Sequence, residues 1–397
     1  MSKKIVQINT TCGIGSTGKI CVDISKMLTE NGVENYILYS NKSNGYELGI
    51  ACSSKKYTKV QALKSRVFGN YGFNSNLETR RMIKHLKQIK PDIVHLHNIH
   101  GHDCNLEMLF NYFRDNKIKL VWTFHDCWAF TGYCPHFTMA GCDKWKRVCE
   151  KCCQYKEYSF GLDKSKILYR RKKELFSGLD LTIVTPSRWL AQIVKQSFLK
   201  EYPVVVINNG IDLKIFNPTS SDFREKYNIP FEKKILLGVA FDWGIRKGLD
   251  VFIELAKRLN GEKYQIVLVG TNSSIDERLP ANIISIHRTH NQKELAEIYT
   301  SADWFINPTR EENFPTVNLE SMACGTPVIT FDTGGSPESL TEKTGIVVPD
   351  KNWLALYEII ENFGEGQEYE ENECVLNAQR FEKNNKYQEY LKVYDLY

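Results

Sequence analysis

The sequence predicts an α/β protein made of two doubly wound domains, each with a parallel sheet. Its 397 residues exceed the usual size of one domain, so two domains are expected. Short apolar runs typical of strands alternate with amphipathic segments typical of helices, a pattern that favours parallel sheets covered by helices. The alternation pauses once and then resumes, which indicates a boundary between the domains.

The strand-like runs fall into two series, separated by that pause. The first series comprises residues 4–9, 36–40, 92–96, 119–124, 181–185 and 203–207. The second series comprises residues 234–241, 264–270, 282–287, 304–308 and 326–331. Helical patterns such as the one from Leu77 to Ile89 lie between most of them.

Residues 208–220 are the expected joint, because Gly, Asn, Asp and Pro cluster there. We therefore expect an N-terminal domain over residues 1–210 and a C-terminal domain over residues 211–379. The polar, helical stretch at about 380–397 is expected to pack back on the first domain. Two such sheets leave a crevice at the carboxyl ends of their strands, where these folds bind ligands.

Charge is distributed unevenly along the chain. Residues 1–200 carry 32 Lys and Arg against 16 Asp and Glu, whereas residues 201–397 carry 20 against 31. The basic half favours an anionic partner such as a membrane surface, phosphates or nucleic acid. Its cations gather on two expected helices: Arg80, Arg81, Lys84, Lys87 and Lys90, and Lys164, Lys166, Arg170, Arg171, Lys172 and Lys173. We hypothesise that these helices dock on anionic lipid.

No apolar run approaches the ~18 residues of a membrane span. The N-terminal sequence has an apolar patch too short for a signal-peptide core. We therefore expect a cytoplasmic protein that is peripheral, at most, on the inner face of the cell membrane.

A glycine loop follows the first expected strand and opens a helix. Gly13, Gly15 and Gly18 match the pattern GxGxxG, which brings backbone N–H groups close to an anion. A nicotinamide enzyme would also need a carboxylate after the second strand, but residues 41–43 are Asn-Lys-Ser and the next acid is Glu47. An NAD-dependent oxidoreductase thus remains an alternative that lacks the expected ribose-binding carboxylate. The other role open to the loop is contact with an anion or a sugar.

Two glutamates, Glu312 and Glu320, flank the expected start of a helix near Thr316 that runs to Ala323. The N–H groups of its first turn would face the crevice, where they can hold phosphate oxygens. Carboxylates on either side of an anion site suit a ligand with hydroxyls at both ends of a diphosphate, such as a nucleotide sugar. Taken alone, the pair also fits a favourable charge at the helix dipole beside a solvated glutamate.

Five of the twelve cysteines crowd into residues 134–153, inside an expected insertion over 126–157. The spacing of Cys134, Cys142, Cys149 and Cys152 offers four thiolates, the shell that structural zinc prefers. Reduced buried thiols and an iron–sulfur site are the alternatives. His136 or Cys153 could replace one ligand.

Histidines cluster after the third and fourth strands. His125 and Asp126 follow residues 119–124, at the edge where active-site groups lie. A lone histidine is more often a structural hydrogen-bonding group. His95 and His97 lie two residues apart and so share one face of a strand, and His100 and His102 follow soon after. We expect these histidines to line the crevice, with metal binding as the alternative.

Residues 308–338, PTREENFPTVNLESMACGTPVITFDTGGSPE, resemble the signature segment of retaining, nucleotide-sugar-dependent glycosyltransferases of the GT-B fold, specifically family 4. Further pieces of that family's pattern follow in order: the glycine loop, KPDIVHLHN (90–98), FHDCW (124–128), TPSRWLA (185–191), NNGID (208–212) and RKGLD (246–250). With its cysteine cluster, the chain is most similar to bacterial capsular or exopolysaccharide transferases.

The resemblance implies a role for each matching residue. Glu320 would bind the ribose hydroxyls of the donor and Glu312 the hydroxyls of its sugar. The amides of Phe314, Thr316 and Val317 would meet sugar and phosphate.

Lys247 would stabilise the charge of the leaving diphosphate, and Gly15 would approach that group from the first domain. The family's arginine five residues before this lysine is replaced by Asp242, so that Arg246 is the candidate substitute. His125 would lie beside the donor sugar at the reacting centre.

From this resemblance we expect a transferase that moves a sugar from a UDP- or GDP-sugar to a glycan acceptor. A lipid-linked glycan is the expected kind of acceptor. No catalytic metal is expected, and zinc would be structural. A third class, a zinc-stabilised nucleic-acid-binding protein, would use the basic half, but no nucleic-acid-binding motif accompanies that charge.

Overall fold

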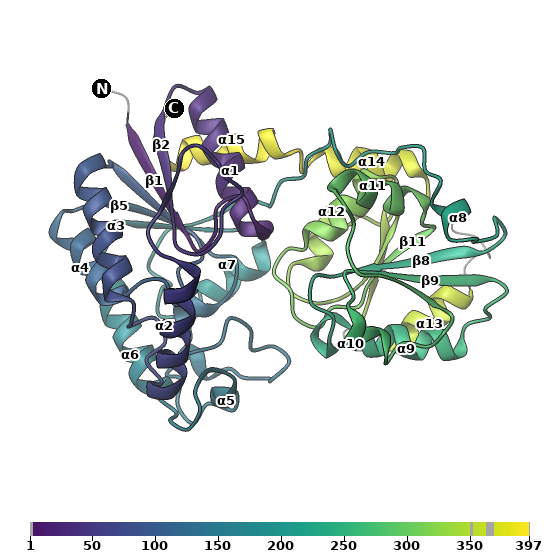
Figure 1. The fold of residues 1–397 in the computed structure, drawn as a ribbon, viewed down its shortest axis with the longest axis horizontal. Helices are drawn as coiled ribbons and strands as arrows, with labels where there is room; N and C mark the ends of the chain where they lie inside the picture. The colour runs from purple at the N-terminus through teal and green to yellow at the C-terminus, as the bar shows by residue number, and fades with distance from the viewer. Residues whose placement is uncertain (1–2, 350–351, 363–368, 397) are drawn as a thin grey trace. The chain divides into compact units, whose positions relative to one another are not determined.

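The computed structural model describes residues 3–349, 352–362 and 369–396. The chain forms two compact units, each built on its own sheet (Figure 1). Unit 1 comprises Met1–Asn208 and Asn384–Tyr397, and unit 2 comprises Asn209–Lys383. The chain therefore enters unit 2 after Asn208 and returns to unit 1 for its last helix.

Unit 1 contains a seven-stranded parallel sheet with the order β3-β2-β1-β4-β5-β6-β7. Its strands are β1 (Lys4–Asn9), β2 (Glu34–Tyr39), β3 (Gly49–Ala51), β4 (Ile93–Leu96), β5 (Lys119–Thr123), β6 (Leu181–Thr185) and β7 (Val204–Val206). The order reverses between β1 and β4. That topological switch point is where doubly wound folds bind ligands.

Helices cover both faces of this sheet. They are α1 (Gly15–Glu30), α2 (Lys55–Phe68), α3 (Asn76–Ile89), α4 (Leu106–Asp115), α5 (Tyr155–Tyr158), α6 (Ser165–Phe176), α7 (Arg188–Val194) and α15 (Lys383–Val393), with short 3₁₀ turns η1 (Trp128–Phe130) and η2 (Lys144–Lys146). Neighbouring strand residues point to opposite faces. Ile5 packs with α1 and α15, whereas Val6 packs with α3, α4 and α6.

Unit 2 repeats the design with a six-stranded parallel sheet in the order β10-β9-β8-β11-β12-β13. Its strands are β8 (Lys234–Val239), β9 (Tyr264–Val269), β10 (Ile283–Ile286), β11 (Trp304–Asn307), β12 (Val328–Phe331) and β13 (Gly345–Val348). Its helices and turns are α8 (Phe223–Lys226), η3 (Ile245–Lys247), α9 (Leu249–Arg258), α10 (Ser273–Asp276), α11 (Gln292–Ser301), α12 (Thr316–Ala323), η4 (Ser336–Ser339), α13 (Trp353–Glu361) and α14 (Glu371–Gln379). Here the switch point lies between β8 and β11.

The α/β fold with two doubly wound parallel sheets confirms the fold class predicted from the sequence. Two strands, β3 and β13, were missed. Each is the edge strand of its sheet and only three or four residues long, so neither carries a full apolar run. None of the helices in the described part of the chain is long and apolar enough to cross a membrane.

Candidate active site

The switch point of unit 2 brings together two loops, one from each of its flanking strands. The loop after β8 contains Arg246 and Lys247, and the loop after β11 contains Glu312 and Phe314. Because β8 and β11 are parallel neighbours, both loops leave the same edge of the sheet. Residues 65 positions apart in sequence thus share one site.

Lys247 and Glu312 form an ion pair at this edge. The Lys247 ammonium lies 2.6 Å from Oε2 of Glu312, and both side chains are one-fifth exposed. The other oxygen, Oε1, accepts a hydrogen bond of 3.0 Å from the backbone N–H of Asn313. The pair is therefore largely shielded from water and held in a defined orientation.

Helix α12 begins at the same place. Pro315 occupies its N-cap position and offers neither an N–H group nor a capping side chain. The N–H groups of Thr316 and Val317 belong to the first turn, which has no acceptor within the helix. This end of α12 therefore presents donors and the positive end of the helix dipole.

A buried amide network locks α12 against the sheet. Asn318 accepts a hydrogen bond of 2.8 Å from the side chain of Asn307, at the end of β11. Its own amide donates to the hydroxyl of Ser336 at 3.1 Å. Because Asn318 is fully buried, the position of the first turn of α12 is fixed by satisfied polar contacts. Asn318 was not predicted from the sequence, because its residue type alone does not mark a buried amide contact.

The backbone also encloses Glu312 tightly. Gly334 has a φ of 59°, and a Cβ atom there would lie 1.8 Å from the carbonyl oxygen of Glu312. The N–H of Gly335 donates to the carbonyl of Asn313 at 2.8 Å. Only glycine fits at position 334, so residues 334–335 act as a wall that positions the Glu312 loop.

Glu320 projects from the second turn of α12 and is half-buried. Its Oε2 accepts a hydrogen bond of 3.1 Å from the hydroxyl of Tyr299, on α11. Burial, followed by the charge of Glu320, raises the pKa of Tyr299. Tyr299 therefore stays a neutral donor and orients this carboxylate.

Two arginines flank the Lys247–Glu312 pair. Nη1 of Arg246 lies 3.5 Å from the carbonyl oxygen of Glu311. Arg310 instead forms a fork with both carboxylate oxygens of Asp250, at 2.7 and 2.8 Å. Arg246 thus remains beside the site, whereas Arg310 braces the loop against α9. Asp242, at the position of the family's arginine, is exposed.

In unit 1, Gly15 opens α1 after the short loop that follows β1. Its φ is 70°, and a Cβ atom there would meet nothing within 4 Å. The loop thus has a backbone that glycine favours and open space in front of it. His125 also lies in unit 1, whereas the other predicted donor-binding residues lie in unit 2.

His125 stands at the end of a hydrogen-bonded row of buried side chains. Its Nε2 is 3.1 Å from Nδ1 of His97, and the two rings stack 5.5 Å apart. Nε2 of His97 is 3.0 Å from Oε1 of Gln7. The amide nitrogen of Gln7 donates to the carbonyl of Cys21 at 2.9 Å, which fixes Oε1 on the side of His97.

This row determines the protonation of each ring. Burial lowers the pKa of His97 well below its usual value and that of His125 to about 4, so both are neutral near pH 7. Because Gln7 presents an acceptor, the proton of His97 lies on Nε2. Its Nδ1 then accepts, so His125 donates from Nε2 and keeps its lone pair on Nδ1.

His95 belongs to a second row beside the first, and its ring lies 4.0 Å from that of His97. It contacts the hydroxyls of Thr123 at 2.8 Å and Tyr394 at 2.7 Å. Tyr390 in turn contacts Thr123 at 2.9 Å. Both tyrosines come from the C-terminal end of the chain, so that end supports the floor beneath His125.

Asp126 pairs with His100, whose Nε2 lies 2.9 Å from its Oδ2. Burial alone would raise the pKa of Asp126, but His100 outweighs it and holds that pKa at about 2. Burial likewise opposes a charge on His100, but Asp126 raises its pKa above the usual value. The loop after β4 and the loop after β5 are thus tied by an ionic contact.

The four cysteines predicted as zinc ligands lie in one part of unit 1. Cys134 and Cys149 are buried, and Cys142 and Cys152 pack against the same core. Burial, then the charges of neighbouring thiols, raises the pKa of Cys134, and burial raises that of Cys149 to about 12 and that of Cys152 to about 11. Within the described residues, no three His, Cys, Asp or Glu side chains form a group that could hold a metal ion.

Lys172 corrects one detail of the predicted basic surface. It is fully buried, and its ammonium lies 3.5 Å from the centre of the Trp128 ring. It donates to the carbonyls of Trp128 at 2.8 Å and Thr131 at 3.1 Å. Residue 172 falls on the inner face of α6, where the apolar residues Leu168 and Leu175 also lie, so it fastens η1 rather than facing solvent.

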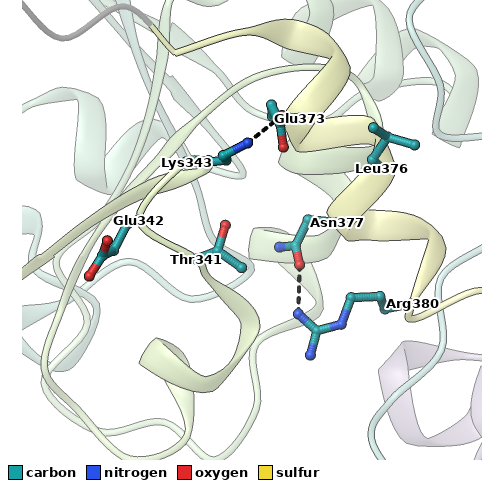
Figure 2. A pocket seen from close by; sticks show the side chains of 7 residues that line it. All are labelled: Thr341, Glu342, Lys343, Glu373, Leu376, Asn377 and Arg380. Carbon is teal, nitrogen blue, oxygen red and sulfur yellow. Dashed lines mark hydrogen bonds and ion pairs between the residues drawn. The ribbon is translucent and has the colours of Figure 1, made fainter.

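A surface hollow of about 540 Å³ lies elsewhere in unit 2, between α14 and the turn before β13 (Figure 2). Figure 2 shows Arg380 hydrogen-bonded to Asn377, and Lys343 paired with Glu373. None of the predicted site residues lines it. Its cations are balanced by acids, so it has no marked preference for an anion.

Two doubly wound units, one of which gathers a cation, a carboxylate and a helix N-terminus at its switch point, form the architecture of a GT-B sugar transferase. Family comparison agrees with this class. Residues 17–215 match the model of "Glycosyltransferase Family 4", and residues 220–392 match that of "Glycosyl transferases group 1". The chain belongs to these glycosyltransferases and is a transferase enzyme. This result favours the predicted family over the oxidoreductase and nucleic-acid-binding alternatives.

The curated relatives include bacterial glycosyltransferases. The putative colanic acid biosynthesis glycosyl transferase WcaC of Escherichia coli is 24% identical over 89% of both chains. An N,N'-diacetylbacillosaminyl-diphospho-undecaprenol alpha-1,3-N-acetylgalactosaminyltransferase of Campylobacter jejuni is 30% identical over 52% of this chain and 57% of that protein.

Solved structures share the fold at low identity. Sucrose-phosphate synthase from Thermosynechococcus elongatus superposes with a TM-score of 0.70 at 16% identity, covering 99% of this chain and 98% of that one. HepE of Anabaena in complex with UDP gives 0.70 at 14% identity, covering 100% of both chains. These values establish the GT-B fold of the protein.

Proposed function

We propose that the protein is a retaining glycosyltransferase of surface-polysaccharide biosynthesis, such as that of a capsule. It would transfer a sugar from a UDP- or GDP-sugar to a glycan acceptor carried on a lipid diphosphate. The observation that carries the proposal is the Lys247–Glu312 pair at the switch point of unit 2, beside the start of α12. The names of the colanic acid and undecaprenol-linked relatives, and the UDP bound to HepE, support the substrate classes.

The donor would bind along the first turn of α12. The amides of Phe314, Thr316 and Val317 would donate to its phosphate and sugar oxygens. Glu320, oriented by Tyr299, would accept from the ribose hydroxyls. Gly15, with open space before it, would allow the backbone of unit 1 to approach the diphosphate.

Lys247 would act on the leaving group. As the bond between the sugar C1 and the diphosphate oxygen breaks, negative charge grows on that oxygen, and a fixed ammonium stabilises it. Arg246 is the second cation within reach of the same loop. Glu312, held by Lys247 and the Asn313 amide, would accept from hydroxyls of the donor sugar.

The acceptor hydroxyl would form the new bond to C1 on the face that the diphosphate leaves, and its proton would pass to the departing diphosphate oxygen. His125 would contribute the neutral Nδ1 lone pair as an acceptor for a hydroxyl of the sugar. It would position the donor without forming a covalent bond to it. No step in this scheme requires a metal.

A donor screen tests the proposal. Thermal unfolding of the protein should shift upward with UDP- or GDP-sugars, and Lys247→Ala and Glu320→Ala should abolish that shift. Lys257→Ala, an exposed lysine of α9, is the matched control and should retain it. An equal shift in all four proteins would refute the site. The anomeric configuration of the product, read by NMR, distinguishes retention from inversion.

We also propose that the cysteine cluster binds a structural zinc ion. Support comes from the donor set, four thiols in one polar insertion, although the described side chains are not grouped as ligands. Metal analysis of the purified protein should give one zinc ion per chain, falling to none in Cys134→Ser/Cys149→Ser. A zinc-free native protein of unchanged stability would leave the cysteines as reduced core thiols.

Finally, we propose that the protein works in the cytoplasm, peripherally on the inner face of the cell membrane. A lipid-linked acceptor would be presented there. The excess of basic residues in the first 200 positions supports attraction to anionic headgroups.

A further inference from the structure

Helix α2 has its amphipathic faces reversed relative to an ordinary surface helix. Val60, Leu63 and Val67 follow one another at helical spacing and are 50%, 57% and 47% exposed. A helix on a globular protein normally turns such a stripe toward the core. Here the stripe faces outward along most of the helix.

The inward face of α2 is polar instead. Thr58, Gln61 and Ser65, at the same spacing on the opposite side, are less than one-tenth exposed. The hydroxyl of Ser65 accepts a hydrogen bond of 2.9 Å from Asn74, and that of Thr58 donates to the carbonyl of Ser54 at 3.2 Å. The Thr58 bond lies within the helix, whereas the Asn74–Ser65 bond ties the polar face of α2 to a neighbouring segment. Rotation to bury the apolar stripe would break that bond.

The apolar surface extends beyond the helix. Phe68 is 55% exposed at its C-terminal end, and Phe160 and Leu162 are 63% and 52% exposed. The segment that carries Phe160 and Leu162 is fastened to this end of α2. The N–H of Phe160 donates to the carbonyl of Arg66 at 2.9 Å, and the Arg66 guanidinium lies 5.7 Å from the Phe160 ring.

We call this surface the α2 patch, comprising Val60, Leu63, Val67, Phe68, Phe160 and Leu162. Contiguous exposed apolar surface of this kind marks an interaction site.

Positive charge surrounds the α2 patch. Residues 55–68 contain five Lys and Arg and no Asp or Glu. Lys56, Lys59 and Lys64 are exposed, and none of them takes part in an ion pair within the described chain. Cations beside an apolar stripe complement a bilayer surface, where phosphates lie just above the acyl chains.

We propose that the α2 patch is the surface by which the protein docks on an anionic phospholipid bilayer. Val60, Leu63 and Val67 enter the boundary between headgroups and acyl chains, Phe68, Phe160 and Leu162 extend that contact, and the three lysines bind lipid phosphates. This inference rests on the proposed membrane association and adds an apolar contact to the two basic helices predicted for it, because most apolar residues of α6 are buried and leave only its cations to face lipid. A second copy of the chain suits the patch less well. Its α2 helix would bring a second set of lysines with no acidic residue to pair with them, so the two positively charged helices would repel each other.

Vesicle sedimentation of the full chain tests the proposal without donor or acceptor. Vesicles of equimolar phosphatidylglycerol and phosphatidylcholine should bind the wild type about tenfold more tightly than pure phosphatidylcholine at low salt. Val60→Ser/Leu63→Ser/Val67→Ser should weaken binding at least about tenfold at low and high salt. Lys56→Gln/Lys59→Gln/Lys64→Gln should weaken it mainly at low salt, because salt screens the lysine contribution.

Matched controls replace exposed residues of the same kind elsewhere. Phe231→Ser/Leu354→Ser/Leu376→Ser removes three exposed apolar side chains of unit 2, and Lys195→Gln/Lys263→Gln/Lys293→Gln removes three exposed lysines. Both should bind vesicles like the wild type. Equal binding by the serine variant of α2 and its control would overturn the proposal. So would concentration-dependent dimerisation that the serine variant abolishes, since a second copy would then cover the patch.

Nucleotide-sugar thermal shifts of the α2 variants should remain those of the wild type. This readout separates a failed docking surface from a failed assignment of the enzyme.

Discussion

Nε2 of His125 lies 3.1 Å from Nδ1 of His97, and this contact decides which nitrogen of His125 carries its proton. The position of that proton depends on Gln7, because the Oε1 atom of Gln7 accepts a hydrogen bond from Nε2 of His97. A residue of the first strand therefore sets the chemistry of a ring at the end of the fifth strand. Gln7 and His97 are positioning residues, because they act on substrate only through His125.

Replacing Gln7 with Leu should disturb that ring without removing it. His97 loses the acceptor that fixes its proton on Nε2, so His125 should become a mixture of tautomers. We expect kcat to fall about tenfold, with a smaller change in the KM for the donor. Ring ¹⁵N chemical shifts of His125 should change from Nε2-protonated to mixed.

Thr123→Val is the matched control, since it removes a contact of His95 and leaves the Gln7–His97 contact in place. Its His125 shifts should match the wild type. If His125 of the Gln7→Leu variant stayed protonated on Nε2 alone, the relay would be refuted even if activity fell.

The Lys247–Glu312 pair allows a charge-reversal test. Lys247→Met should lower kcat/KM by about 100-fold or more, because the leaving diphosphate loses its cation. The double variant Lys247→Glu/Glu312→Lys restores the ion pair at the same position, so its melting temperature should recover. Its activity should not, because the ammonium now stands where sugar hydroxyls bind. Recovery of activity in the swapped protein would mean that the pair serves only stability.

Gly334→Ala probes the wall beside Glu312. The added methyl group cannot fit 1.8 Å from the Glu312 carbonyl, and φ is 59° there. We expect a loss of more than about 1 kcal/mol in the free energy of unfolding, together with weaker donor binding. Gly261→Ala is the control, because a Cβ atom at Gly261 meets nothing within 4 Å. Denaturant unfolding and donor titration measure both effects; unchanged donor binding in the Gly334 variant would contradict the positioning role.

Much of the fold could be predicted from the sequence because apolar periodicity is a local property. Glu312, Glu320 and the start of α12 at Thr316 followed from residue types within one short segment. Lys247 was assigned only by family resemblance, since its contact with Glu312 joins loops after two different strands. The sequence could not give that distance.

Other features of the structure could not be predicted from short stretches of sequence, because they depend on which face of a helix is covered by neighbouring elements. Lys172 and Lys173 are neighbours of the same type, yet the first is buried and the second exposed. The stripe on α2 obeys the same spacing as a core helix, and only the position of its neighbours turns it outward. The role of Gln7 likewise depends on β1 and β4 being adjacent, with Gln7 opposite His95 in the register.

Acid should destabilise unit 1 through its buried histidines. An unfolded histidine binds a proton near pH 6.5, whereas the folded pKa is about 4 for His125 and His102 and well below the usual value for His95 and His97. Burial is the first cause in each case.

Between pH 6.5 and about 4 the unfolded chain therefore binds more protons. The stability of the fold is complete above pH 6.5 and is lost as the pH falls. Each histidine contributes up to about 1.4 kcal/mol per pH unit in this window. His100 opposes this trend, because Asp126 raises its pKa. Asp126, with a pKa of about 2, lowers the stability of the fold only in stronger acid, where its carboxylate becomes protonated.

Thermal unfolding at a series of pH values measures this slope. The melting temperature should fall between about pH 6.5 and pH 5, and His95→Gln should reduce the fall by removing one of the contributing groups. His85→Gln on α3 changes a histidine outside these rows and should keep the wild-type slope. A melting temperature that is constant or rises on acidification would show that the buried rings accept protons in the folded state, and the tautomer assigned to His125 would then fail with them.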